Sequence, residues 1–341
     1  MLQAIRVEDA VGTVLCHDLT KIVPGKTKGP AFKKGQVITE EDIPELLDMG
    51  KSHIYVWAVK KDQVHEDDAA IRLSRALGGK GISFTEPKEG KVSLIADFNG
   101  MCTINEDLLV QVNMIEDMVV ATRSNRRPVI KGDIIAGIRV VPLVIDESKL
   151  QMVEHLSKEQ ETIRVKPFHS LKVGIITTGS EVYSGRIEDK FGPVVKEKIE
   201  SYGCEVFEQI IVPDDVEQIS AAIHSLKAEG AELILTTGGM SVDPDDVTPR
   251  SVREAGAEIV TYGAPVLPGA MLMVAYLGDV TILGLPGCVM YHKTTIFDLM
   301  IPLVLVGERI DKAMVAKLGL GGLCLNCKVC SYPVCTFGTG A

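Results

Sequence analysis

The strongest constraint on the fold is the regular alternation of short apolar runs and amphipathic stretches over residues 173–306. The predicted strands are VGIITT (173–178), EVFEQII (205–211), ELILTT (232–237), MLMVAY (271–276) and VTILG (280–284), and the predicted helices cover 190–202, 215–229, 249–255 and about 289–306. Near-continuous apolar strands between amphipathic helices are typical of a parallel sheet covered on both faces. We therefore predict an α/β domain over residues 171–310, with three α/β/α layers and a mostly parallel sheet.

The rest of the chain has a different pattern. Residues 1–146 are predicted to form a β-rich α+β accessory region of one or two small modules, with extended runs at 92–96, 108–112 and 133–145. Residues 147–170 predict a polar helix followed by a linker. Residues 311–341 form a tail that holds four of the eight cysteines.

Composition excludes two classes of partner. The net charge is −10 and no basic stripe offsets it, so the sequence does not favour nucleic acid as a partner. The longest apolar stretch, 294–307, contains Asp298 and Pro302 and is too short to cross a bilayer. We expect a cytoplasmic protein without a membrane partner.

The most informative motif is LILTTGGMSVDPDDVTP at 233–249. A strand that ends in Thr-Thr-Gly-Gly presents backbone N–H groups at the carboxyl edge of a sheet, where they can bind an anion. A carboxylate a few residues later, such as that of Asp246, can hold a divalent cation against that anion. The motif predicts an anion site beside a metal-binding acid.

Two other segments belong to the same predicted edge. The strand at 173–178 ends in Thr178-Gly179, and Gly284-Leu285-Pro286-Gly287 closes a third strand. Ligands of open α/β sheets bind beyond the carboxyl ends of the strands. The alternative is that each segment is only a tight turn, and that Asp189 and Asp214 are acids that cap helices.

The tail carries the spacing Cys324-x2-Cys327-x2-Cys330-x4-Cys335. Four soft ligands at such spacing suit a zinc ion or an iron–sulfur cluster. The alternative is a flexible, redox-labile tail, which the surrounding glycines permit.

With these motifs in view, residues 171–308 resemble the molybdopterin-binding domain of molybdopterin adenylyltransferases and molybdenum insertases. The most specific match is TTGGMSVDPDDVTP, supported by TTGSEV (177–182), GRIEDK (185–190), VPDD (212–215) and GLPG (284–287). The first half, with VEDAVGTVL (7–15) and KGDIIAGIRVVPL (131–143), is similar to the additional modules of the insertase branch. The Cys-rich tail is not part of the general family pattern.

The resemblance implies a ligand, molybdopterin with its terminal phosphate, either free or adenylated, and a bound Mg²⁺. Asp246 is implied as the magnesium ligand or as the residue that positions the phosphoanhydride, and Asp246, Asp214 and Glu181 are implied as catalytic residues. The residues implied in binding the pterin phosphate are Thr178, Gly179, Thr237, Gly238, Gly239, Ser241, Pro286, Gly287 and Asp189. A homodimer is also implied.

The sequence departs from the family pattern near the expected site. Insertases carry lysines around a Pro-Gly pair that appears here between Leu267 and Ala270, and both flanking positions are apolar. These two apolar positions make the active site divergent. Without a cationic clamp, we expect an oxyanion to bind weakly there.

Three functions follow from the resemblance. The first is a transferase of molybdenum cofactor biosynthesis, a molybdopterin molybdenumtransferase that inserts molybdate and releases AMP. The second is a non-catalytic carrier or sensor of the cofactor that serves molybdoenzyme apoproteins. The third is a molybdopterin adenylyltransferase.

Overall fold

The computed structural model describes residues 3–23, 27–56, 62–241 and 243–340, so Val242 of the central motif lies outside the described residues. Contacts between Cα atoms divide the chain into two compact units. The first comprises residues 1–97, 104–122 and 132–164, and the second comprises residues 98–103, 123–131 and 165–341.

The first unit is an α+β structure. A four-stranded antiparallel sheet has the order β6-β7-β11-β9, and α2 packs on β7 and β11. Its elements are β1 Gln3–Arg6, β2 Leu19–Val23, β3 Thr27–Phe32, α1 Asp42–Asp48, β4 His53–Val56, β5 Gln63–His65, α2 Glu66–Leu77, β6 Ile82–Phe84, β7 Lys91–Ala96, α3 Glu106–Asn113, β9 Met118–Thr122, β11 Ile134–Val140, β12 Val144–Asp146 and α4 Glu147–Leu156.

The second unit is built on a six-stranded sheet of order β15-β14-β16-β19-β18-β17. The first four strands are parallel, and β18 and β17 are antiparallel, which confirms the predicted mostly parallel α/β sheet. The elements are β8 Gly100–Ile104, β10 Arg127–Val129, β13 Ile163–Pro167, β14 Lys172–Thr178, α5 Ser180–Tyr183, α6 Phe191–Glu200, β15 Glu205–Val212, α7 Val216–Ala228, β16 Leu233–Thr237, α8 Thr248–Glu254, β17 Glu258–Tyr262, β18 Met273–Leu277, β19 Val280–Leu285, α9 Ile296–Leu305 and α10 Lys312–Lys317.

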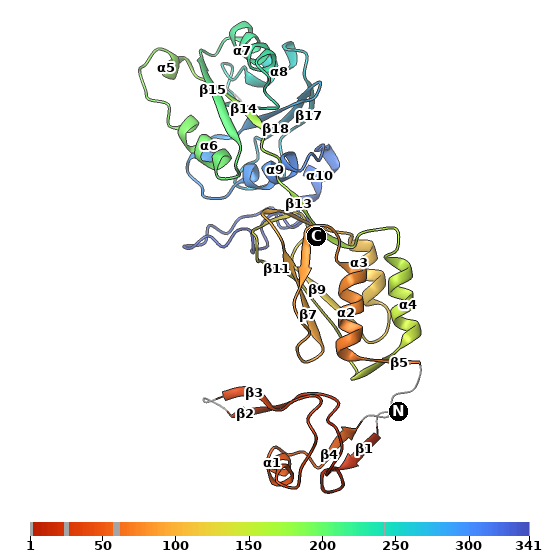
Figure 1. Cartoon of the computed structure of the whole chain (residues 1–341). Coiled ribbons are helices and arrows are strands. Elements are labelled where there is room, and N and C mark those ends of the chain that lie inside the picture. The colour runs from red at the N-terminus through yellow and green to blue at the C-terminus, as the bar shows by residue number, and fades with distance from the viewer. Residues whose placement is uncertain (1–2, 24–26, 57–61, 242, 341) are drawn as a thin grey trace. The chain divides into compact units, whose positions relative to one another are not determined.

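Alternating side chains of the central strands supply two cores, one on each face of this sheet. Ile175 and Leu235 pack with the apolar faces of α6 and α9, whereas Ile176 and Ile234 pack with those of α7 and α8. Figure 1 shows α7 and α8 on one side of the strands and α6 and α9 on the other. The domain is therefore a three-layer α/β/α structure, in which all of these strand residues are buried.

Two sequence predictions were wrong in detail. The run at 108–112 is helical, because Asn105 accepts a hydrogen bond from the backbone N–H of Leu108 and so caps α3. The last helix does not start near residue 289. A 3₁₀ turn spans Gly287–Met290, and α9 starts only at Ile296, after a capping box between Thr295 and Asp298.

None of the described helices combines the length and the apolar character needed to cross a membrane.

Candidate functional site

The candidate site lies at the carboxyl edge of the six-stranded sheet. In the register of the parallel strands, Thr177 lies opposite Thr237, and Thr237 lies opposite Leu285. The chain therefore leaves the sheet at three neighbouring points, through Thr178-Gly179, Gly238-Gly239 and Pro286-Gly287. This edge brings together segments that are far apart in the sequence.

The two glycines of the central motif are required by packing between loops. Gly238 has φ +87°, and a Cβ atom there would lie 2.2 Å from the carbonyl oxygen of Thr178. Gly239 has φ +54°, and its Cβ would lie 2.6 Å from Oγ1 of Thr248. Both residues therefore let the loop after β16 approach other protein atoms closely.

Threonine hydroxyls stabilise the packing of these loops against the strand ends. Thr248 donates from Oγ1 to the carbonyl oxygen of Gly238 at 3.0 Å, and its Oγ1 lies 3.3 Å from that of Thr178. Thr237 donates to Oγ1 of Thr177 at 3.3 Å. All four threonines are buried, so these hydrogen bonds join the strand ends inside the protein.

The loop after β16 offers unused hydrogen-bond donors. Among the described residues, the backbone N–H groups of Gly239, Met240 and Ser241 have no hydrogen-bond acceptor. Tyr262 at the end of β17 donates from its hydroxyl to the carbonyl oxygen of Met240 at 2.8 Å, and that hydroxyl lies 3.1 Å from the carbonyl oxygen of Ser241. The carbonyls are therefore held by Tyr262, while the N–H groups remain available to an acceptor such as a phosphate oxygen.

Asp246 is half-buried in the same loop. Its Oδ2 accepts a hydrogen bond from the backbone N–H of Asp243 at 2.9 Å. Burial raises the pKa of Tyr262, and the negative charge of Asp246 raises it further. The described residues contain no group of three or more His, Cys, Asp or Glu side chains placed to hold a metal ion. The magnesium site at Asp246 therefore remains a prediction.

The other predicted acids take part in local hydrogen bonds. Asp214 accepts from the backbone N–H of Ser180 at 2.8 Å and from its hydroxyl at 3.1 Å. Asp189 accepts from the backbone N–H groups of Phe191 and Gly192 at the start of α6, and from Gln209 Nε2 at 2.6 Å. The side chain of Glu181 is exposed on the short helix α5. Asp189 and Asp214 thus hold the loop after β14 in place.

The third strand end is open. Gly287 is exposed, and a Cβ atom there would meet nothing within 4 Å, whereas Pro286 is buried.

The Leu267–Ala270 segment, where the family resemblance predicts lysines, is held by the C-terminal tail. Leu267 donates its backbone N–H to the carbonyl oxygen of Gly322 and accepts at its own carbonyl from the N–H of Cys324, both at 2.8 Å.

Sequence reasoning missed Thr248 and Tyr262 as parts of this site. The position of Thr248 directly before Pro249 at the start of a helix is a recognisable signal. Tyr262 gives no such signal, because its contact with Met240 depends on β17, a short strand that the sequence pattern did not predict.

The four tail cysteines are free thiols. They line one cavity of about 240 Å³ together with residues of the 291–294 segment.

Comparison with known proteins identifies the domain that carries the site. Residues 174–305 match the family described as a probable molybdopterin binding domain. Residues 4–58 match a domain of unknown function.

Two curated relatives illustrate the similarity. A CinA-like protein of Mycobacterium sp. strain JLS is 38% identical over 92 residues, which cover 27% of this chain and 22% of that protein. The molybdopterin molybdenumtransferase of Haemophilus influenzae is 27% identical over 211 residues, which cover 59% of this chain and 50% of that enzyme. The chain thus spans half or less of the length of these two relatives.

Among solved structures, the molybdopterin biosynthesis enzyme MoaB from Thermus thermophilus is similar at 22% identity and a TM-score of 0.33, covering 40% of this chain and 98% of that chain. The matched family coincides with the α/β unit and with all of the strand ends described above. We conclude that residues 174–305 are similar in sequence to the family described as a probable molybdopterin binding domain.

Proposed function

We propose that the carboxyl edge of the six-stranded sheet binds molybdopterin by its terminal phosphate, and that the chain acts in molybdenum cofactor biosynthesis. One observation carries this proposal: the backbone N–H groups of Gly239, Met240 and Ser241 have no acceptor among the described residues and lie within the molybdopterin-binding domain match. Fixed N–H dipoles of this kind bind an anion without a cationic side chain.

The remaining residues take supporting roles in this proposal. Thr237 and Gly238 shape the loop, Thr178 and Gly179 form the wall on one side, and Pro286 and Gly287 form the wall on the other. Asp189 and Asp214 act as positioning residues, because their carboxylates hold the backbone of the loop after β14. Glu181 is exposed beside that loop and is available to the ligand.

Asp246 is the proposed magnesium ligand. Its carboxylate is half-buried and uses Oδ2 for the N–H of Asp243. Carboxylates combined with ligand phosphate oxygens are the usual environment of protein-bound Mg²⁺. The ion would supply charge neutralisation at a phosphate or a phosphoanhydride.

The proposed reaction is that of a molybdopterin molybdenumtransferase. Adenylated molybdopterin is bound, its phosphoanhydride bond is cleaved with addition of one water, and AMP leaves. Molybdate forms two Mo–S bonds to the pterin dithiolene, and one of its oxygens leaves as water with the two thiol protons. The chain's own contribution is preorganised N–H donors, which stabilise negative charge that develops on the phosphate oxygens.

The test is release of AMP from adenylated molybdopterin, measured with and without molybdate and Mg²⁺. We expect AMP release that depends on both, and a loss of roughly tenfold or more in Asp246→Asn, because a magnesium ligand is removed. Glu217→Gln, an exposed change in the first turn of α7, is the matched control and should keep the full rate. No AMP under any condition would exclude the transferase reaction.

One observation favours a second candidate, a non-catalytic carrier or sensor of the cofactor. The segment where lysines are expected carries Leu267 and Ala270 instead, and the tail occupies both backbone hydrogen-bonding groups of Leu267. A carrier would bind molybdopterin tightly without releasing AMP. Release of pyrophosphate from ATP and molybdopterin in the same assay would instead indicate an adenylyltransferase.

We further propose a homodimer that acts in the cytoplasm and delivers the cofactor to molybdoenzyme apoproteins. Light scattering of the purified chain tests the dimer, and co-purification with a molybdoenzyme apoprotein tests the delivery step.

A further inference from the structure

The C-terminal segment after α10 folds into a loop with defined anchors. Leu267 and Leu323 form a β-bridge, and Gly338 donates its backbone N–H to the carbonyl oxygen of Gly321 at 2.8 Å. Phe337 is buried with the core that includes α9, and Tyr332 packs against the same core. The tail is therefore part of the second unit.

Side chains fix the far end of this loop. The hydroxyl of Tyr332 donates to the carbonyl oxygen of Asp298 in α9 at 2.6 Å. The guanidinium of Arg127 donates to the carbonyl oxygen of Phe337 and lies over the Tyr332 ring, 5.6 Å from its centroid. These contacts set the loop's shape without using a single cysteine thiol.

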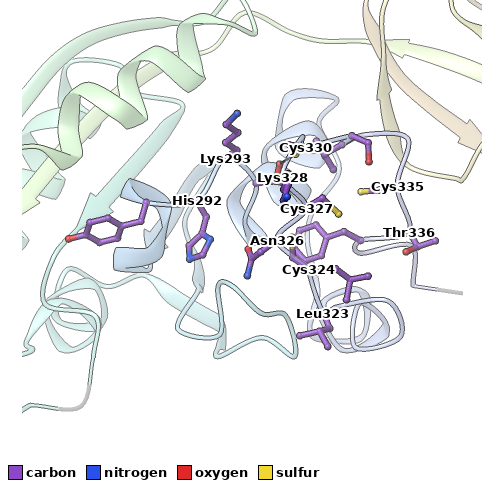
Figure 2. A pocket seen from close by; sticks show the side chains of 16 residues that line it. His292, Lys293, Leu323, Cys324, Asn326, Cys327, Lys328, Cys330, Cys335 and Thr336 are labelled. Carbon is purple, nitrogen blue, oxygen red and sulfur yellow. Dashed lines mark hydrogen bonds between the residues drawn. The ribbon is translucent and has the colours of Figure 1, made fainter.

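The four cysteines of the loop face one cavity. Figure 2 shows Cys324, Cys327, Cys330 and Cys335 around the pocket, which is also lined by His292, Lys293 and Lys328. The cavity volume is about 240 Å³. Cys327 and Cys330 are exposed, Cys324 and Cys335 are half-buried, and all four are free.

We propose that Cys324, Cys327, Cys330 and Cys335 bind one thiophilic metal centre in this cavity. Four thiolates match the ligand preference of a zinc ion and of an iron–sulfur cluster, and the experiment below distinguishes the two. This site lies outside the pterin-phosphate edge and does not depend on the proposed function.

Binding requires rotation of the cysteine side chains. Among the described residues, no three potential ligands already stand at a metal-binding arrangement. A cysteine has one side-chain torsion with three staggered positions, so its sulfur can move without any change in the backbone. The anchors described above hold the backbone of the loop while the sulfurs turn inward.

The surroundings of the cavity suit a centre with negative charge. A metal ligated by four thiolates carries a net negative charge, and Lys293 and Lys328, which also line the cavity, offset it. Oγ1 of Thr294 lies 3.1 Å from Sγ of Cys330, which places a hydroxyl donor next to a ligand sulfur. Each thiol loses its proton on binding, so the affinity falls as the pH decreases.

The test is metal analysis of the full-length protein, purified without oxygen and without added pterin. We expect about one zinc per chain, or iron with acid-labile sulfide and visible absorption, as four-thiolate sites bind these metals tightly. The double variant Cys327→Ser/Cys330→Ser should lose metal by roughly tenfold or more, because two ligands are removed from exposed positions. Cys288→Ser, a half-buried cysteine outside the cavity, should retain it.

Reconstitution makes the result decisive. The apoprotein is incubated with zinc in one arm and with iron and sulfide in the other, and circular dichroism verifies that the double variant is folded. Wild-type protein that stays metal-free in both arms overturns the proposal, as does a folded double variant that binds as much metal as wild type. Molybdopterin binding is measured separately, so a failure of the pterin site leaves this result unaffected.

Discussion

At the scale of single residues, the Thr-Thr-Gly-Gly motif has two roles. Its glycines satisfy the packing of the loop against Thr178 and Thr248, and its following N–H groups remain without acceptors among the described residues. The first role affects the stability of the protein, and the second affects ligand binding. Substitutions at single positions can separate the two effects.

Gly238→Ala tests the packing role. The change places a Cβ atom 2.2 Å from the carbonyl oxygen of Thr178 at a φ of +87°. A strained backbone of this kind costs roughly 1–3 kcal/mol, so we expect the free energy of unfolding to fall by that amount. The urea concentration at the midpoint of unfolding should fall accordingly. Gly287→Ala is the control, because its Cβ would meet no atom within 4 Å. Equal midpoints for the two variants would show that the loop is not packed as described.

His65 in the first unit predicts a dependence of stability on pH. Burial lowers the pKa of His65, and the charge of Lys34, whose Nζ is 2.9 Å from Nδ1, lowers it further. The unfolded state then binds a proton near pH 6.5 while the folded state is still neutral. The contribution of neutral His65 to the free energy of unfolding is therefore fully present above that pH. It decreases as the pH falls, by up to about 1.4 kcal/mol per pH unit.

Urea unfolding at pH 7.5 and 5.5 measures this loss. The His65→Gln variant, whose amide does not titrate, should lose less free energy of unfolding than wild type over the same interval. Equal losses in the two proteins would remove His65 as the cause.

At the scale of elements, the start of α9 depends on the carboxylate of Asp298. Asp298 accepts at Oδ2 from the backbone N–H and hydroxyl of Thr295, and at Oδ1 from Lys198 at 2.6 Å. The side chains of Lys198 and Asp298 are only 18% and 13% exposed. One carboxylate therefore serves both as a helix cap and as the partner of a mostly buried cation.

Asp298→Ala should destabilise the second unit markedly. The change removes the cap and leaves Lys198 without its carboxylate, for which we expect a loss of roughly 2–4 kcal/mol in the free energy of unfolding. Glu200→Ala breaks a comparable lysine pair that is half-exposed, at 3.8 Å from Lys196, and should cost less than about 0.5 kcal/mol. Thermal unfolding of both variants measures the difference. Similar decreases in Tm for the two variants would show that Asp298 does not stabilise α9 in this way.

Element boundaries were predicted well where local signals are strong. Helix α7 begins after its cap Asp215 and spans Val216–Ala228, close to the predicted range 215–229. The run at 108–112 was predicted as a strand because its apolar residues are nearly continuous, yet burial of Leu108 and Val112 follows a helical spacing. Short strands such as β17 carry too few residues for a pattern.

At the scale of the whole molecule, the α/β architecture was predictable because the central strands β14, β16 and β19 are buried and carry near-continuous apolar runs. The contact-defined units were not, since residues 98–103 and 123–131 join the second unit from within the first half. The candidate edge followed from the strand ends alone. The bonds of Asp214 to Ser180 and of Tyr262 to Met240 join residues 34 and 22 positions apart, which no local pattern reveals.

Binding of molybdopterin at the carboxyl edge of the six-stranded sheet can be measured by anaerobic titration of the full chain, followed by amide hydrogen exchange. We predict saturable binding, competition by inorganic phosphate, and slower exchange confined to residues 178–181, 237–241 and 285–288. Saturable binding with protection elsewhere, or no binding at all, would show that molybdopterin does not bind at this edge.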